Sequence, residues 1–173
     1  MYGSITLAGR RIDNLPYEAM RRIRGKEIGA IFQDPLTSLN PLYTIGRQLV
    51  ETIRTHLDLG PAKARGRALS LLREVGIAGA DERIDHYPHQ FSGGMRQRIV
   101  IALALAADPR LIIADEPTTA LDVSIQAQII ALLKRLGRDH GTAIMLVTHD
   151  MGVIAETAHR VAVERNIPTP GVK

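Results

Sequence analysis

Apolar residues in this chain fall into a few short continuous runs. LIIAD (residues 111–115) and AIMLVTH (143–149) begin with unbroken apolar stretches, a pattern typical of strands buried on both faces of a parallel sheet. IGAIFQ (28–33) predicts a further strand, which ends at the turn-forming cluster DPLTSLNP. GSITLAG (3–9) alternates and ends in glycine, so it predicts a short strand followed by a turn.

Other stretches carry apolar residues at helical spacing. They predict amphipathic helices over about 45–59 and 62–75, with Gly60 and Pro61 between them. Ser92 is a natural N-cap, because its hydroxyl can accept from a free backbone N–H, for a helix that runs to about residue 107.

The second half of the chain alternates between strand and helix. Ser124 is expected to cap a helix that contains IQAQIIALLKRL, and a short helix is expected to begin at Asp150. This order predicts an α/β fold with right-handed crossovers between parallel strands. Residues 164–173 contain two closely spaced prolines and are predicted to be a disordered tail.

Composition narrows the function classes. The chain has 173 residues, enough for one domain with a real core, and its net charge of +4 is spread along the sequence as on a solvated surface. Aromatic residues make up only 3%, which argues against a platform for stacking nucleic-acid bases. The absence of cysteine excludes disulfides and zinc–thiolate sites and fits a reducing compartment.

The longest apolar run is about half of a bilayer span, and MYGSITLAG lacks a signal-peptide core. Any membrane role is therefore expected to be peripheral.

A glycine pair opens the helix that follows residue 92. Ser92, Gly93 and Gly94 stand where free backbone N–H groups and the positive end of a helix dipole suit an anion. Glycine lets a phosphate approach the backbone without a Cβ in the way. An ordinary N-cap followed by loop glycines explains the same residues, so this stretch alone leaves both interpretations open.

Polar residues follow the predicted strands at one edge of the sheet. Asp115 and Glu116 end the LIIAD strand, where α/β proteins bind ligands. Asp115 is a candidate ligand of Mg²⁺ and Glu116 a candidate general base, although a pair of solvated acids is the alternative. His149 ends the next strand, and Gln33 ends IGAIFQ, where its amide could ligate a metal-bound water. We expect these four side chains to gather at the same edge.

Together these motifs carry a family resemblance. FSGGM (91–95) is similar to the LSGGQ signature of ABC transporters, and LIIADEPTTALD (111–122) is similar to Walker B followed by the D-loop, with Asp122 in the D-loop position. Gln33 matches the Q-loop and His149 the switch histidine. Over about residues 1–163 the chain thus resembles the nucleotide-binding subunit of ABC transporters. QDPLTSLNPLYTIGRQ and YPHQFSGGMRQR are similar to the dipeptide and oligopeptide importer branch.

This resemblance implies a P-loop NTPase-like ABC nucleotide-binding domain, with a helical and signature subdomain over about residues 35–95. It implies ATP and Mg²⁺ as ligands, with Asp115 and Gln33 at the metal and with Glu116 and His149 as catalytic residues. It also implies that Ser92 and the following amides contact the γ-phosphate bound by a second, identical or different, ABC subunit. The expected partners are that subunit and an integral membrane permease contacted by about Pro35–Gly76. The expected location is the cytoplasmic face of the inner membrane.

The 173 residues contain no match to the phosphate-binding Walker A motif G-x-x-x-x-G-K-[ST]. The nearest stretch, Gly25-Lys26-Glu27, has no glycine five residues earlier and no Ser or Thr afterwards. ERNIPTPGVK also does not resemble the family's continuation. We therefore expect a domain truncated at both ends.

Three functions remain open at this point. The chain is an ATPase subunit that energises peptide import, a non-transport ABC protein in DNA repair or translation, or a non-catalytic fragment or interaction module. The second class usually carries long coiled coils or tandem domains, and neither is visible in these residues.

Overall fold

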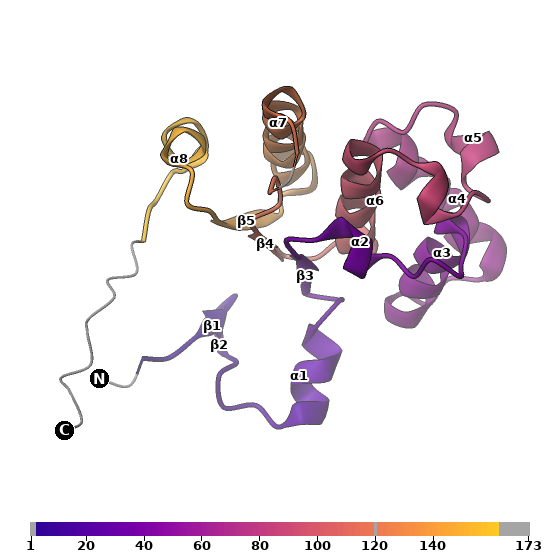
Figure 1. The fold of residues 1–173 in the computed structure, drawn as a ribbon. Coiled ribbons are helices and arrows are strands. Elements are labelled where there is room, and N and C mark those ends of the chain that lie inside the picture. Colours follow the sequence, from indigo (N-terminus) through magenta and orange to yellow (C-terminus); the bar gives the residue numbers. More distant parts are fainter. Residues whose placement is uncertain (1–2, 120, 163–173) are drawn as a thin grey trace, which may run out of the picture.

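A computed structural model describes residues 3–119 and 121–162 (Figure 1). The tail predicted at 164–173 lies outside these residues. In the described part of the chain, no helix is both long enough and apolar enough to cross a bilayer.

The centre of the fold is a parallel sheet of three strands in the order β3-β4-β5. β3 spans Ile28–Ile31, β4 spans Leu111–Asp115 and β5 spans Ala143–Val147. Ile31 pairs with Ala114, and Asp115 pairs with Val147. All three carboxyl ends therefore meet at one edge, which confirms the α/β class.

Three helices lie over one face of this sheet: α6 (Gly93–Leu105), α7 (Val123–His140) and α8 (Met151–Thr157) (Figure 1). A Cβ on Gly29 of β3 would lie 2.4 Å from the carbonyl oxygen of Ala104, so the glycine lets α6 approach the strand. The predicted cap of α6 is confirmed, since Ser92 Oγ accepts from the N–H of Met95 at 3.4 Å. Asp150 likewise caps α8 by accepting from Gly152 N at 2.8 Å.

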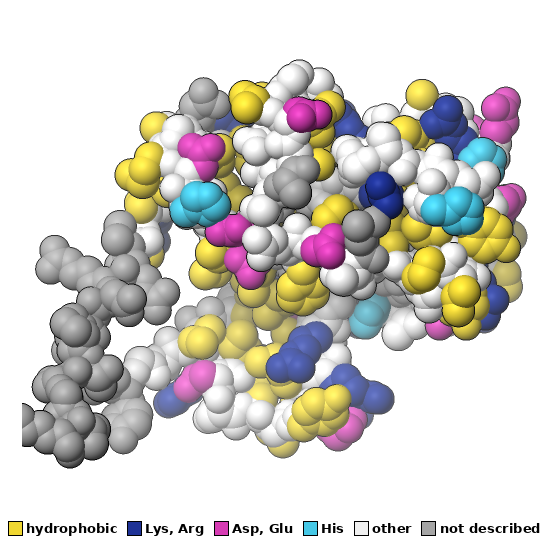
Figure 2. Space-filling view, in the orientation of Figure 1, with side chains coloured by type: hydrophobic (Ala, Val, Ile, Leu, Met, Phe, Trp, Pro, Cys, Tyr) yellow, Lys and Arg dark blue, Asp and Glu magenta, His cyan; other side chains and the backbone are white. Residues whose placement is uncertain are grey.

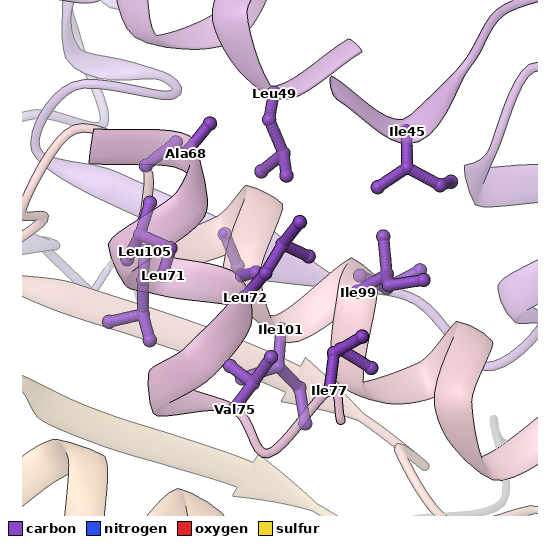
Figure 3. Close-up of a cluster of buried hydrophobic side chains, with 14 of the residues drawn as sticks. Ile45, Leu49, Ala68, Leu71, Leu72, Val75, Ile77, Ile99, Ile101 and Leu105 are labelled. Atoms are coloured by element: carbon purple, nitrogen blue, oxygen red, sulfur yellow. The ribbon is translucent and has the colours of Figure 1, made fainter. Parts of the chain in front are cut away.

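Between β3 and α6 the chain forms a helical unit. It consists of α2 (Pro35–Ser38), α3 (Ile45–His56), α4 (Pro61–Glu74), α5 (Ala80–Arg83) and the 3₁₀ helix η1 (Pro88–Gln90). The apolar faces of α3 and α4 pack against α6 and form the core shown in Figure 3. Ile45, Leu49, Leu72, Ile99 and Ile101 in this core are almost completely buried.

The first described residues lie apart from the three-stranded sheet (Figure 1). β1 (Thr6–Leu7) and β2 (Arg10–Arg11) form a small antiparallel hairpin, and α1 (Tyr17–Ile23) follows it. Figure 2 shows Lys and Arg side chains gathered over this segment.

Two expectations about the second half are wrong in detail. α7 begins at Val123, because the carbonyl of Asp122 already accepts the first helical bond, from Gln126 N at 2.9 Å. Asp122 is therefore the N-cap residue, and Ser124 lies inside the first turn. β5 ends at Val147, so His149 lies beyond the strand rather than at its last position.

A third difference concerns burial of the sheet. Ile112 and Ala114 are buried beneath the helices, whereas Met145 is 53% exposed and Val147 41% exposed on the opposite face. Within the described residues, β5 also has only one neighbouring strand, β4. Among the described residues, helices cover one face of these apolar strands, and the apolar side chains of the other face are left partly exposed.

Candidate functional site

Side chains that follow the three strands meet at the carboxyl edge of the sheet. Nε2 of Gln33, after β3, donates to Oε2 of Glu116, after β4, at 3.1 Å. Nδ1 of His149, after β5, lies 2.7 Å from Oε1 of Glu116. Figure 2 shows a histidine and acidic side chains side by side on this part of the surface. The structure therefore brings three of the four expected edge residues into direct contact.

Glu116 is held in an unusual backbone conformation. Its φ is +44°, in the left-handed region that non-glycine residues rarely adopt. The N–H of Glu116 donates to the carbonyl of Val147 at 2.9 Å, which extends the β4–β5 ladder by one residue. The chain then forms a turn, because the N–H of Thr119 donates to the Glu116 carbonyl at 3.1 Å. Strained residues of this kind cluster at functional sites, which makes the Glu116 turn a candidate site element.

Thr119 is a site residue that sequence reasoning missed. Its Oγ1 donates to Oε2 of Glu116 at 2.9 Å. The signal was its position three residues after Glu116, because a turn of that length returns a hydroxyl to the carboxylate. With Thr119 and Gln33 on Oε2 and His149 on Oε1, both carboxylate oxygens of Glu116 have partners.

The electrostatics of the cluster favour an ionised carboxylate. The hydrogen bonds from His149 and Thr119 lower the pKa of Glu116 below the ordinary value of 4.5. The side chain of Glu116 is 26% exposed, while that of His149 is 80% exposed. Glu116 is thus a charged acceptor at neutral pH, and its histidine partner stands at the solvent side.

Asp115 is the fourth expected residue, and it does not join this cluster. It ends β4 and is exposed, and no hydrogen bond from its side chain is found among the described residues. Nor do residues 3–119 and 121–162 contain three or more His, Cys, Asp or Glu side chains grouped to hold a metal ion. Mg²⁺ usually takes one or two protein oxygens and completes its shell with water and phosphate. The Asp115 carboxylate and the amide oxygen of Gln33, which is not used in the bond to Glu116, fit that type of donor set.

The structure separates the roles of the two signature glycines. A Cβ on Gly94 would lie 2.9 Å from Cγ2 of Ile125, so Gly94 allows close packing of α6 on α7. A Cβ on Gly93 would meet only Cδ2 of Leu121, at 3.8 Å. Space for an approaching group is therefore left at Gly93, beside the N-terminus of α6. This start of α6 borders the segment that contains Asp122, and no bond from it to Glu116 is found among the described residues.

Comparison with known proteins decides the family. The sequence profile of the ABC transporter family matches residues 1–119. The chain belongs to the ABC transporter family. The resemblance inferred from the signature, Walker B and D-loop residues is thereby confirmed.

The relatives of this ABC protein include peptide transport subunits. It is 53% identical over 161 residues to the oligopeptide transport ATP-binding protein OppD of Bacillus subtilis, covering 93% of this chain and 45% of that protein. It is 52% identical over 161 residues to the dipeptide transport ATP-binding protein DppD of the same bacterium, covering 93% and 48%. The chain thus spans about half the length of the relatives it matches.

Solved ABC structures share the fold. A dimeric post-hydrolysis state of the ATP-binding cassette MJ0796 bound to ADP and Pi superimposes with a TM-score of 0.74 at 32% identity, covering 88% of this chain and 65% of that one. CbiO1 of Clostridium perfringens, part of an ABC transporter complex, gives the same TM-score at 27% identity, covering 88% and 58%. The ABC cassette fold expected from the sequence is confirmed.

Proposed function

We propose that this ABC protein is a subunit that binds and hydrolyses ATP to energise the import of dipeptides, oligopeptides or related solutes through a membrane permease. The observation that carries the proposal is the direct contact of Gln33 and His149 with Glu116 at the carboxyl edge of the sheet. The names of OppD and DppD support the class of transported solute.

In this proposal Glu116 is the general base. Its lowered pKa keeps the carboxylate ionised, so it can accept a proton from an attacking water. Oε2 already accepts from Gln33 and Thr119, whereas Oε1 faces only His149, so the release of Gln33 or His149 gives an attacking water more room at the carboxylate. The side chain of His149 is 80% exposed, so it has room to move away from Glu116. It can then donate to a phosphate oxygen.

Asp115 and Gln33 are the proposed protein ligands of Mg²⁺. The ion would supply charge neutralisation at the phosphates of ATP. Asp115 is exposed at the end of β4, and Gln33 bonds to Glu116 through its Nε2 rather than through its amide oxygen. Asp115 and Gln33 would each supply one oxygen atom, which would bind the ion directly or through a water.

Ser92, Gly93 and Gly94 are proposed to serve a nucleotide bound by a second ABC subunit. The hydroxyl of Ser92 accepts from Met95 N, which leaves its own hydrogen free to donate to a phosphate. Gly93 leaves the backbone N–H groups of the helix start open to an anion. Asp122, in the adjacent segment, would lie at the same subunit interface. The dimeric state of the MJ0796 cassette supports this assignment.

The permease is proposed to dock on the helical unit, within about Pro35–Gly76. Leu42 is 78% exposed in the link before α3, and the Arg47 guanidinium lies 3.8 Å from the centre of the Tyr43 ring. A shallow depression on α3 lies next to them, lined by Arg47, Val50, Glu51, Arg54 and Thr55. This mixture of an exposed leucine and a charged groove suits an amphipathic segment of a permease.

The remaining assignments follow from this role. Residues 1–163 are proposed as part of the ABC ATPase domain, with the helical and signature subdomain at about 35–95. The subunit would lie at the cytoplasmic face of the inner membrane, held there by the permease.

The test is ATP-driven peptide uptake by vesicles that contain the protein at its full natural length together with its permease. Glu116→Gln should keep ATP bound and slow hydrolysis by roughly 10²–10⁴-fold, the usual contribution of a general base. His89→Ala, at an exposed histidine outside the cluster, is the control and should hydrolyse ATP normally. Unchanged hydrolysis in Glu116→Gln would remove Glu116 from its role, and uptake that does not require ATP would exclude the transport function.

A second candidate is a non-catalytic module that completes an ATP site on another subunit. The open space at Gly93, beside the Ser92 cap at the start of α6, supports it. The two candidates differ in one result, because a non-catalytic module would tolerate Glu116→Gln and still require Ser92.

A further inference from the structure

Gln97, on the second turn of α6, is a buried amide without a hydrogen-bond partner among the described residues. It is 1% exposed, and neither its Nε2 nor its Oε1 is bonded. Among the described residues, the only other buried polar side chain is that of Thr142, which donates to the carbonyl of Pro109 at 2.8 Å. Because buried polar groups are nearly always paired, the unpaired amide of Gln97 points to a partner in another state of the protein.

The position of Gln97 follows from the packing of α6 on the sheet. Gly29, near the start of β3, lies against the carbonyl of Ala104, near the end of α6. Gln97 is seven residues before Ala104, which is about two helical turns, or roughly 10 Å, along the same stripe of the helix. Because α6 returns to the amino end of β4 through a short link, moving back along α6 leads towards the carboxyl ends of the strands. About 10 Å equals roughly three strand residues. Gln97 therefore lies level with the end of β3, where Gln33 follows.

The segment that leaves Gln33 also contacts α6. α2 begins at Pro35, only two residues after Gln33, and packs against α6 (Figure 1). Nε of Arg96, the residue before Gln97, is also buried and has no hydrogen-bond partner in the described part of the chain. The second turn of α6 thus presents unused donors and an unused acceptor. A peptide backbone offers both an N–H and a C=O, so the main chain of residues 33–38 has the chemistry to satisfy a glutamine amide.

We propose that Gln97 is a positioning residue for Gln33, and that its amide bonds to the main chain of residues 33–38 when Gln33 releases Glu116. This inference rests on the proposed ATPase function. In the described arrangement Gln33 and Thr119 both donate to Oε2 of Glu116, so the release of Gln33 opens a position on that oxygen for a water. Pairing with Gln97 stabilises the moved segment and links the signature helix to the carboxylate that activates water.

The test replaces the amide without changing the volume of the side chain. Gln97→Met removes both hydrogen-bonding groups, and Gln97→Leu is a second variant of similar size. Gln128→Met is the matched control, because Gln128 is exposed on α7 and accepts from Arg98 there. The protein at its full natural length is used, with and without Mg-ATP, and Glu116→Gln is added where ATP must stay bound.

Three quantities are measured. Without nucleotide, Gln97→Met should unfold at the same temperature as the wild type or higher, since no bond is lost. The second measurement compares two proteins that both carry Glu116→Gln. Mg-ATP should slow the hydrogen exchange of residues 33–38 in the protein that keeps Gln97, and it should not do so in the protein that also carries Gln97→Met. The kcat for ATP should fall about fivefold to tenfold, the effect of one hydrogen bond, with KM unchanged.

Two results would overturn the inference. The first is that Gln97→Met and Gln97→Leu show the same ATP-dependent slowing of hydrogen exchange at residues 33–38 as Gln128→Met, and also the same kcat. The other is a large loss of thermal stability without any change in ATP-dependent protection, which would make Gln97 a structural residue only. Failure of the proposed function looks different, because the parent protein itself would then neither bind nor hydrolyse ATP, and the inference would fall with it.

Discussion

Nδ1 of His149 lies 2.7 Å from Oε1 of Glu116, across the ends of two neighbouring parallel strands. The exposures of the two side chains differ, at 80% for the histidine and 26% for the glutamate. The inner residue is thus the strained, hydrogen-bonded acid, and the outer residue is the one free to change partner. This arrangement suits a general base, Glu116, that stays hydrogen-bonded to His149 until a bound ligand forms a new contact with the histidine.

The His149–Glu116 contact predicts a pH effect. Because the pKa of Glu116 is lowered in the folded chain, the contact stabilises the fold above the ordinary glutamate value of 4.5 and is lost as pH falls through the lowered pKa. An NMR titration should therefore place the Glu116 carboxyl below 4.5, and His149→Ala should move it upwards. His89→Ala should leave it unchanged. The same Glu116 titration in His149→Ala and the wild type would contradict the assigned cause.

A polypeptide of residues 1–173 should bind Mg-ATP weakly or not at all. Its only Gly-Lys pair, Gly25-Lys26, lies before β3 at the amino end of the sheet, whereas Glu116 lies at the carboxyl edge. The pair therefore cannot cradle phosphates beside Glu116. Isothermal titration calorimetry checks this, and a micromolar Kd for the 173-residue polypeptide would show the prediction to be wrong.

Mixing this polypeptide with a complete ABC subunit should form one active ATP site, with Ser92 and Gly93 facing the other subunit's nucleotide. Ser92→Arg places a long charged side chain at that helix start and should abolish the added hydrolysis. Gly94→Val is a useful contrast, because it crowds Ile125 and should lower the unfolding temperature of the polypeptide itself. If Ser92→Arg leaves the hydrolysis of the mixed dimer unaffected, the signature does not act between subunits.

The uncovered sheet face predicts marginal stability and self-association for the 173-residue polypeptide. Met145 and Val147 are exposed on β5, whose outer edge has no neighbouring strand in the described residues. Each apolar side chain left uncovered forgoes roughly 1.5–3 kcal/mol of burial, against a total stability of typically about 5–15 kcal/mol. Sedimentation velocity should show association through this edge.

Charges on that face should reverse the effect. Met145→Lys with Val147→Lys should shift the 173-residue polypeptide towards monomer, while Val123→Lys, at an exposed position on α7, should not. Sharp and reversible two-state unfolding of a wild-type monomer above about 60 °C would contradict the prediction.

Local patterns in the sequence were sufficient for the three parallel strands, the N-cap at Ser92, the start of a helix near Asp150, and the family. Apolar runs and capping residues act within a few neighbouring positions, so the sequence carries them directly. Parallel strands also bring their carboxyl ends to one edge, and the meeting of Gln33, Glu116 and His149 followed from that rule.

Only the tertiary structure decided which side chains touch. Gln33 and Glu116 are 83 residues apart, and their contact depends on the register of β3 with β4. The same holds for the amide of Gln97, which is buried on α6 without a hydrogen-bond partner among the described residues. How far Met145 is exposed likewise comes from the structure, because an apolar strand has the same sequence pattern whether one face is covered or both.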